Sequence, residues 1–283
     1  TIDGGSLPAR MKAEQLPAGE LIGDQYAYND TLPEKQFADG GGNEYRNPGF
    51  HWVGDIGLDC NVDVTSSSGK LLLDAVEGGV HFLCAIDVAT GEATLNTKTE
   101  TASKIEFVDA DGKTVANPVA ETAVQGPGSY RIEYVNADDQ IHLWIDGKYV
   151  DFNAATYQRN DVPMPFYSST DAGDAEPLAV GAAGAKLVVQ RLKVVRDIYY
   201  TSTLEKGKID NESGWLNPGE IYSYLRTPEL WSKPKAQDYF SQRKNMLEPM
   251  LTLQRFGDED RGRDQFLPMG DNSPNSLDGR FWN

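Results

Sequence analysis

The sequence predicts a mainly β protein built around an antiparallel β-sandwich, with a short helical segment near the C-terminus. Between residues 46 and 200, short runs of alternating apolar and polar residues recur at nearly regular spacing. Clusters of Gly, Asp, Asn and Ser separate these runs, as expected for strands that are joined by tight turns. Many short strands of this kind are typical of antiparallel sandwiches.

The predicted strands follow one another along the middle of the chain. The first is 56–64, where apolar residues alternate with polar ones up to Val64. The others are expected at 70–76, 80–88, 105–108, 130–135, 140–145, 149–152 and 187–195. Gly78-Gly79, Asp111-Gly112 and Asp146-Gly147 supply turns between several of them.

Composition divides the chain into three parts. Residues 1–45 are rich in Gly, Pro and Asp and indicate an irregular connector, while 46–200 hold the predicted strands. Residues 201–283 change again to polar loops with a short helix. Thr227 is the expected N-cap of that helix and Pro228 its first residue, and Pro234 is expected to end or kink it.

Charge and hydropathy exclude some classes of function. The chain has 43 acidic and 26 basic residues, a net charge of −17, which argues against a nucleic-acid partner because phosphate binding needs a basic surface. No run of 18 apolar residues occurs, so no membrane-spanning segment is predicted. The first residues lack the features of a signal peptide, and the absence of an initial Met suggests a piece excised from a longer protein.

The metal-ligating residue types are few. Cys60 and Cys84 cannot make a structural zinc site alone, because such sites need four ligands, and three His argue against a His-rich site. The two cysteines either form a disulfide or remain buried free thiols. Asp138 and Asp139 either form a turn or join a calcium site with other loop carboxylates. No cofactor is expected.

One predicted hairpin carries a pair of aromatic residues. His142 and Trp144 are two residues apart and therefore share one face of their strand, where Trp144 either stacks on a sugar or packs in the core. The hairpin formed by 128–135 and 139–148 resembles a late hairpin of concanavalin-like and laminin-G-like jelly rolls. This resemblance implies a jelly-roll-like sandwich of a kind that often binds glycans and sometimes calcium.

The most specific motif lies in residues 266–282. Its fixed positions are Met269, Gly270, Asp271, Asn272, Ser276, Asp278 and Arg280. At this spacing the motif resembles the last conserved box of bacterial type I signal peptidases. Ser273 and Gly279 depart from the pattern of that family.

The resemblance implies a serine endopeptidase with a Ser–Lys dyad, in which a buried neutral Lys takes the proton of the nucleophilic Ser. Ser276 would orient that Lys through a hydrogen bond. The residues expected to support the site are Gly270, Asp271, Asn272, Asp278 and Arg280. The resemblance also implies that Asp271 pairs with an Arg beside the Lys, and that Asp278 and Arg280 share an ion-pair network.

The nucleophile and the base of this family are missing from the chain. None of the five Met residues follows a Ser, and Pro218-Gly219-Glu220 is not preceded by Lys-Arg. We therefore expect an inactive fragment of a signal peptidase of planctomycete-like form. Residues 1–45 would leave a peptidase core of signal-peptidase-type β fold, 46–200 would be an inserted laminin-G-like sandwich, and 201–283 would return to the core.

The full enzyme would remove signal peptides from exported preproteins at the exoplasmic or periplasmic face of the cytoplasmic membrane, through an anchor outside this chain. Its partners would be preproteins and a glycan or envelope partner of the sandwich. The alternative is a non-catalytic glycan- or protein-binding β-sandwich module. A glycoside hydrolase of concanavalin-like type is disfavoured, because no E-x-D-x-x-E strand occurs.

Overall fold

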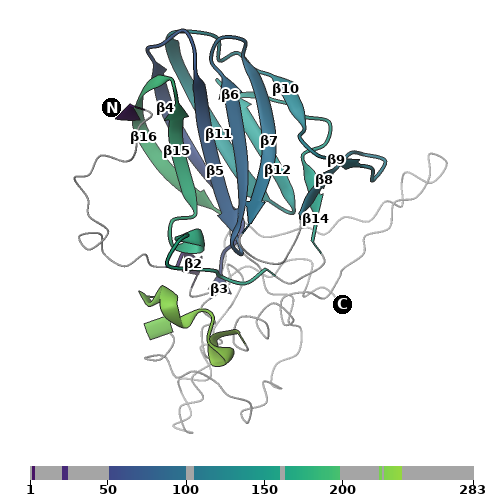
Figure 1. Ribbon diagram of the computed structural model, residues 1–283, viewed down its shortest axis with the longest axis vertical. Coiled ribbons are helices and arrows are strands. Elements are labelled where there is room, and N and C mark those ends of the chain that lie inside the picture. The colour runs from purple at the N-terminus through teal and green to yellow at the C-terminus, as the bar shows by residue number, and fades with distance from the viewer. Residues whose placement is uncertain are drawn as a thin grey trace, which may run out of the picture.

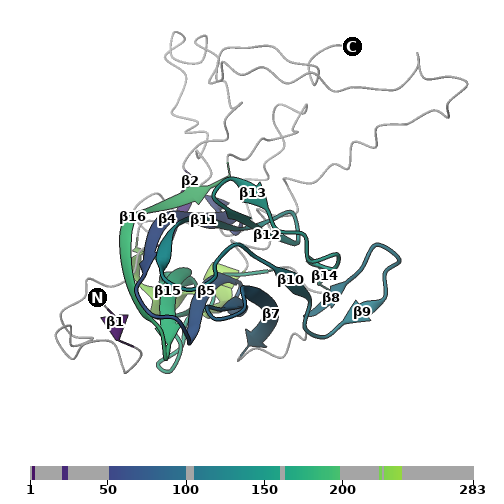
Figure 2. The same ribbon diagram turned by 90° about the horizontal axis from the view of Figure 1, so that it is seen from above.

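The protein is described here by a computed structural model, which covers residues 2–3, 21–24, 51–99, 105–159, 163–197, 223–224 and 226–237. In this part of the chain, two antiparallel sheets lie in two layers (Figures 1 and 2). The mainly β, antiparallel sandwich predicted from the sequence is confirmed. The predicted domain boundaries near residues 45 and 200 fall outside the described residues.

The larger sheet has nine described strands, in the order β1-β16-β4-β11-β12-β14-β8-β9, with β13 paired to β12. Their bounds are β1 (Ile2–Asp3), β4 (Ile56–Val64), β8 (Glu106–Val108), β9 (Thr114–Val115), β11 (Gly128–Ala137), β12 (Gln140–Ile145), β13 (Lys148–Tyr149), β14 (Thr156–Gln158) and β16 (Lys186–Arg196). All of its pairings are antiparallel, and β11 lies between β4 and β12.

The smaller sheet has five described strands in the order β10-β7-β6-β5-β15. Their bounds are β5 (Lys70–Glu77), β6 (Val80–Asp87), β7 (Glu92–Thr99), β10 (Val119–Glu121) and β15 (Leu178–Ala183). A separate pair joins β2 (Gly23–Asp24) to β3 (His51–Trp52). The strand predicted at 149–152 is shorter than expected, because β13 ends at Tyr149.

The core lies between the two sheets and is built from alternate residues of each strand. On β4 the inward-facing residues are Leu58, Cys60 and Val62, all with 0% exposure. Cys60 and Cys84 are free thiols rather than a disulfide. Burial raises the pKa of Cys60 to about 11 and that of Cys84 to about 12, so both remain protonated and inert.

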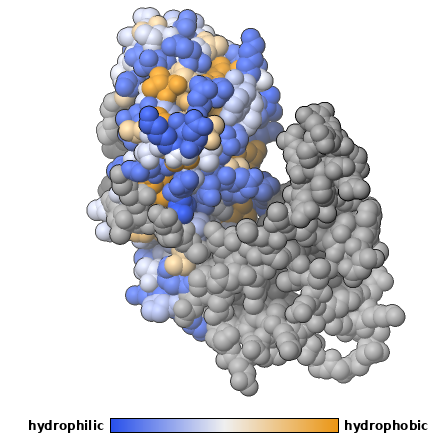
Figure 3. All heavy atoms as spheres, turned by 90° about the vertical axis from the view of Figure 1, so that its right-hand side faces the viewer, coloured by the Kyte–Doolittle hydropathy of each residue, from blue (hydrophilic) through white to orange (hydrophobic). Residues whose placement is uncertain are grey.

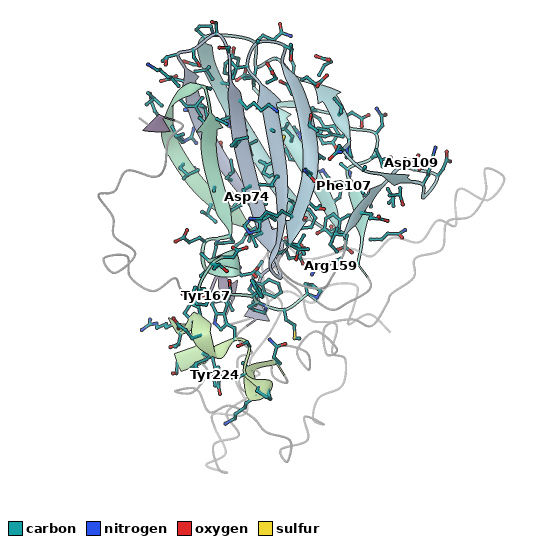
Figure 4. All side chains as sticks on the ribbon, viewed as in Figure 1. Asp74, Phe107, Asp109, Arg159, Tyr167 and Tyr224 are labelled. Carbon is teal, nitrogen blue, oxygen red and sulfur yellow. The ribbon has the colours of Figure 1, made fainter. Side chains whose placement is uncertain are left out.

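A buried polar network joins the two sheets near one end of the strands. Glu77 of β5 accepts hydrogen bonds from the hydroxyl of Tyr157 (2.8 Å) and from the side-chain amide of Asn136 (3.2 Å). Arg159 contacts the same carboxylate at 3.5 Å and lies near the lower end of the strands in Figure 4. These donors replace the water molecules that a buried carboxylate loses, which offsets the cost of its burial.

The loop before β15 is held on the smaller sheet by one carboxylate. Asp174 lies in the short helix η3 (Gly173–Ala175) and is 2% exposed. Its oxygens accept the backbone N–H groups of Gly78 and Gly79, both at 2.9 Å, and of Phe166 at 2.8 Å. Gly78 and Gly79 both have positive φ, and a Cβ on Gly79 would clash with the Phe166 ring.

A second tether is the imidazole of His81 on the outer side of the smaller sheet. Its Nδ1 lies 2.7 Å from Asp74, labelled in Figure 4, and its Nε2 lies 2.9 Å from Asp171. The hydrogen bond to Asp74, the Asp74 charge and the Asp171 contacts outweigh burial and raise the pKa of His81 to about 9. The ring is therefore charged at neutral pH.

The described C-terminal residues are short helical turns. A 3-10 helix, η4 (Pro228–Leu230), begins at the predicted proline, although Thr227 makes no side-chain cap hydrogen bond. Pro234 begins the helical turn at 234–237 rather than ending one, since proline fits the first turn of a helix. Trp231 is fully buried with Leu21 and Ala236 in a small second cluster.

The surface is predominantly hydrophilic on the side that carries β8, β9 and β10, with scattered apolar patches (Figure 3). Across the described part of the chain, no helix has the length and apolar character needed to span a membrane.

Replacing Asp174 by Ala should lower the free energy of unfolding by about 3 kcal/mol, because three backbone N–H groups, two of them buried, lose their acceptor. Urea denaturation would measure this change. The control is Asp151→Ala, whose carboxylate accepts one exposed N–H, from Asn153. That variant should lose about 0.5 kcal/mol. Equal losses in the two variants would contradict the tethering role of Asp174.

His81 should make stability depend on pH above neutrality. Its pKa is raised from 6.5 to about 9 on folding, so its stabilising contribution is complete below pH 6.5 and is lost as the pH rises through 9. Chemical denaturation of the protein and of His81→Asn should show a stability difference that shrinks across this window. The matched control is His142→Asn, because burial lowers the pKa of His142 and its contribution should stay constant there.

Candidate functional site

The site residues predicted from the C-terminal motif lie outside the described residues. They are Gly270, Asp271, Asn272, Ser276, Asp278 and Arg280. The chemistry-bearing side chains that the structure describes gather instead on the sandwich.

His142 and Trp144 lie on the outer face of the larger sheet. They alternate along β12 with Ile141, Leu143 and Ile145, which are at most 2% exposed and face the core. Trp144 is partly exposed, so the expectation that it packs in the core is wrong. Its cross-strand neighbours are Glu133 on β11 and Tyr149 on β13.

His142, Trp144 and Tyr149 form an aromatic cluster on this face. The rings of His142 and Trp144 are stacked, with centroids 5.5 Å apart and planes inclined by 20°. Tyr149 packs against Trp144 at 5.5 Å and is 45% exposed. Burial lowers the pKa of His142 and favours its neutral form. The cluster therefore presents an uncharged aromatic surface to solvent.

Tight turns hold this hairpin in register. Asp146 and Gly147 both have positive φ and join β12 to β13, and Asp146 accepts the backbone N–H of Arg131 at 2.8 Å. Asp138 and Asp139 also have positive φ and join β11 to β12. Their turn geometry favours the turn interpretation over a calcium site.

Beside the aromatic cluster lies a charged network formed by Arg131, Asp59 and Glu133. The guanidinium of Arg131 donates from Nε and Nη2 to the two oxygens of Asp59 at 3.1 and 3.2 Å. Its Nη2 also lies 3.0 Å from Glu133 Oε1. The hydrogen bond from Arg131 holds the pKa of Asp59 below its ordinary value. Such a fork fixes all three side chains while Arg131 stays 46% exposed.

Register places these groups in one line across the sheet. Tyr149 lies opposite Trp144, Trp144 opposite Glu133, Glu133 opposite Asp59, and Asp59 opposite Lys193. We call this line of five residues the cross-strand row. An aromatic surface thus stands next to fixed hydrogen-bonding groups, an arrangement suited to a ligand with one apolar face and several polar groups.

The other clusters of titratable groups have structural roles. Both ring nitrogens of His81 are occupied by carboxylates, so this residue cannot accept a proton from a nucleophile. Among the described residues, no group of three or more His, Cys, Asp or Glu could hold a metal ion.

The chain was compared with known proteins. No protein-family model matches it, and no curated protein matches it. Sheep galectin-11, solved in complex with glycerol, is 11% identical, over 50% of this chain and 90% of that chain, with a TM-score of 0.32. Galectin LEC-6 of Caenorhabditis elegans is 11% identical, over 62% and 96%, with a TM-score of 0.32. The carbohydrate-binding module CBM66 from Bacillus subtilis is 11% identical, over 50% and 74%, with a TM-score of 0.30.

The predicted membership of the type I signal peptidases is wrong, as are the serine endopeptidase activity and the preprotein substrates inferred from it. No family model matches the chain, and the solved structures named above are two galectins and a carbohydrate-binding module rather than peptidases. The motif consists of small polar residues and an Asp–Arg pair, which also occur in ordinary turns and surface ion pairs. Without a nucleophile or base, such a motif specifies no chemistry.

Sequence reasoning missed Asp59, Arg131, Glu133 and Tyr149. Alternation along β11 does place Arg131 and Glu133 on one face. Their proximity to Asp59, 72 residues away from Arg131, depends on the register of β4 against β11.

Replacing Arg131 by Gln should raise the pKa of Asp59 towards its ordinary value of 3.8, because the lowering hydrogen bond is lost. A carboxyl-carbon NMR titration of Asp59 would measure the change. The control is Lys113→Gln, which removes a charge from the exposed β8–β9 turn and should leave the pKa of Asp59 unchanged. An unaltered pKa in the Arg131 variant would disprove the charged network in solution.

Proposed function

We propose that the sandwich is a non-catalytic carbohydrate-binding module that holds a sugar on the outer face of its larger sheet. The observation that carries this proposal is the position of the aromatic cluster, directly beside the Arg131–Asp59–Glu133 network in the cross-strand row. The sugar ring would lie against Trp144, with its hydroxyls directed towards the charged network.

The aromatic cluster suits the apolar side of a sugar ring. A pyranose exposes C–H groups on its faces, and these pack favourably on an indole or phenol ring. His142 supports the indole by stacking on it at 5.5 Å, and Tyr149 braces the hairpin from the next strand. The indole is therefore held in place before a ligand arrives, which lowers the entropy cost of binding.

The charged network suits sugar hydroxyls. Carboxylate oxygens accept hydrogen bonds and a guanidinium donates them, so Asp59, Glu133 and Arg131 offer both kinds of partner. The fork between Arg131 and Asp59 already fixes their geometry. Hydrogen bonds to charged groups are stronger than those between neutral groups, which favours recognition of a specific hydroxyl pattern.

The same network argues for binding rather than hydrolysis. A glycoside hydrolase needs a carboxylic acid whose raised pKa keeps it protonated as a proton donor. Here the hydrogen bond from Arg131 lowers the pKa of Asp59 and favours its ionised form, and the same guanidinium also contacts Glu133. Asp59 is therefore suited to accept hydrogen bonds rather than to act as a general acid.

Replacing Trp144 by Ala should weaken glycan binding more than tenfold, because central aromatic residues carry much of the affinity of such surfaces. A glycan array would identify a bound sugar, and calorimetry would measure its affinity for each variant. Trp144→Phe keeps an aromatic ring and should retain most of the binding. The matched control, Val119→Ala on β10, changes an exposed apolar residue on the other sheet and should bind normally.

Two results would contradict the proposal. The first is the absence of any bound glycan on an array tested at high protein concentration. The second is unaltered glycan affinity in Trp144→Ala, which would show that the sugar binds at another surface of the protein.

A further inference from the structure

The last strand of the larger sheet is interrupted beside the charged network. The register of β16 against β4 shifts between Gln190 and Lys193, and within this bulge Arg191 has a φ of +49°. Residues other than glycine adopt such a φ uncommonly. A bulge inserts an extra residue and redirects the side chains around it, and bulges are frequent beside binding sites.

The bulge brings two cations to the end of the cross-strand row. Lys193 pairs in register with Asp59, and the positive charges of Arg191 and Lys193 both act on the Asp59 carboxylate. Yet both oxygens of Asp59 already accept hydrogen bonds from Arg131. Arg191 and Lys193 are both exposed, and neither forms an ion pair with another described residue.

The positive charge of Arg191 and Lys193 is opposite in sign to the net charge of the whole chain. The protein carries a net charge of −17, whereas β16 holds no acidic residue, and two of its basic residues, Arg191 and Lys193, lie together at the end of the row. Cations concentrated at one place on an acidic protein attract an anionic group there. An anionic group bound there would lie in line with the aromatic cluster, because the cross-strand row runs from Lys193 to Trp144.

The distance along the row fits a ligand of more than one sugar unit. Lys193 and Trp144 are separated by three inter-strand steps, through Asp59 and Glu133. Neighbouring strands lie about 4.8 Å apart, so the two side chains begin about 14 Å from each other. A single sugar ring is too short for both contacts, whereas a short oligosaccharide reaches them.

We propose that the ligand of this face is an acidic oligosaccharide, with one ring on Trp144 and a carboxylate or sulfate group held by Arg191 and Lys193. This inference rests on the carbohydrate-binding function proposed above. It adds the chemical class of the ligand and its direction across the sheet, from the aromatic cluster towards β16.

A different explanation for the same residues is protection of a sheet edge. Lysines and bulges on edge strands discourage pairing with other chains. Beyond Leu187, β16 has no further strand beside it among the described residues. Protection of this kind requires no ligand, so a dependence of sugar affinity on Arg191 and Lys193 separates the two explanations.

The test measures calorimetric affinity of the full chain for oligogalacturonides and for the same oligomers after reduction of their carboxyl groups. A sulfated galactan oligomer distinguishes sulfate from carboxylate as the preferred anion. The acidic form should bind about fivefold more tightly than the reduced form at low salt, the size expected from two exposed ion pairs. Added salt should diminish this ratio.

Arg191→Gln combined with Lys193→Gln should abolish the preference for the acidic oligomer and leave binding of the reduced one unchanged. The matched control is Lys70→Gln with Lys113→Gln, which removes the same charge from β5 and the β8–β9 turn and should keep the preference. If the substitution in the bulge prevents folding, Lys193→Gln alone, at a regular strand position, should still reduce the preference.

The outcomes separate this inference from the proposed function. Sugar binding through Trp144 without preference for the acidic form would overturn the inference alone, as would a preference that survives in the double variant. Equal affinity for a poly-glutamate peptide would show that charge alone is recognised and would also overturn it. Failure of every saccharide to bind would overturn the proposed function and the inference with it.

Discussion

The pairing of β11 with β4 on one side and β12 on the other is the constraint on which the core and the candidate face both depend. Side chains alternate across a strand, so a slip of one residue would turn every inward-facing side chain outward. The buried residues Ile132 and Tyr134 hold β11 in place, and Tyr134 donates a hydrogen bond to the carbonyl of Phe82 on the opposite sheet (3.0 Å). This bond crosses the sandwich and fixes Arg131 and Glu133 on the outer side.

Buried charged groups stabilise the lower end of the sandwich, where the strands connect to loops. Glu77 joins strands of both sheets, while Asp174 secures the loop before β15 through three backbone N–H groups. Burial and the charges of Glu77 and Asp138 raise the pKa of Asp55, close by, to about 7. Burial of the Glu77 and Asp174 carboxylates is tolerated because hydrogen bonds from the protein replace those lost from water.

The alternation of residues predicted the central strands well and the edges poorly. Ile56–Val64, Val80–Asp87 and Gln140–Ile145 form strands at the predicted positions, with alternate residues buried. β7 and β15 were missed because β7 is largely polar and β15 consists mainly of small residues, so neither has a clear apolar period. Their positions are set by pairing with β6 and β5.

The site was predicted only where a single strand determines it. The spacing of His142 and Trp144 placed both residues on one face, but it did not show that this face lies outside. The link between Arg131 and Asp59 depends on long-range register, which no local pattern encodes. The C-terminal motif led to a wrong family for a related reason, since its local match was unsupported by residues elsewhere in the chain.

The free thiols of Cys60 and Cys84 have a consequence for where such a sandwich can fold. The two cysteines fill volume on the inner faces of opposite sheets and form no covalent link between them. Folding of the described sandwich therefore requires no oxidant and no disulfide exchange. Its stability comes from packing, hydrogen bonds and ion pairs rather than from a disulfide, and it should be the same under reducing and oxidising conditions.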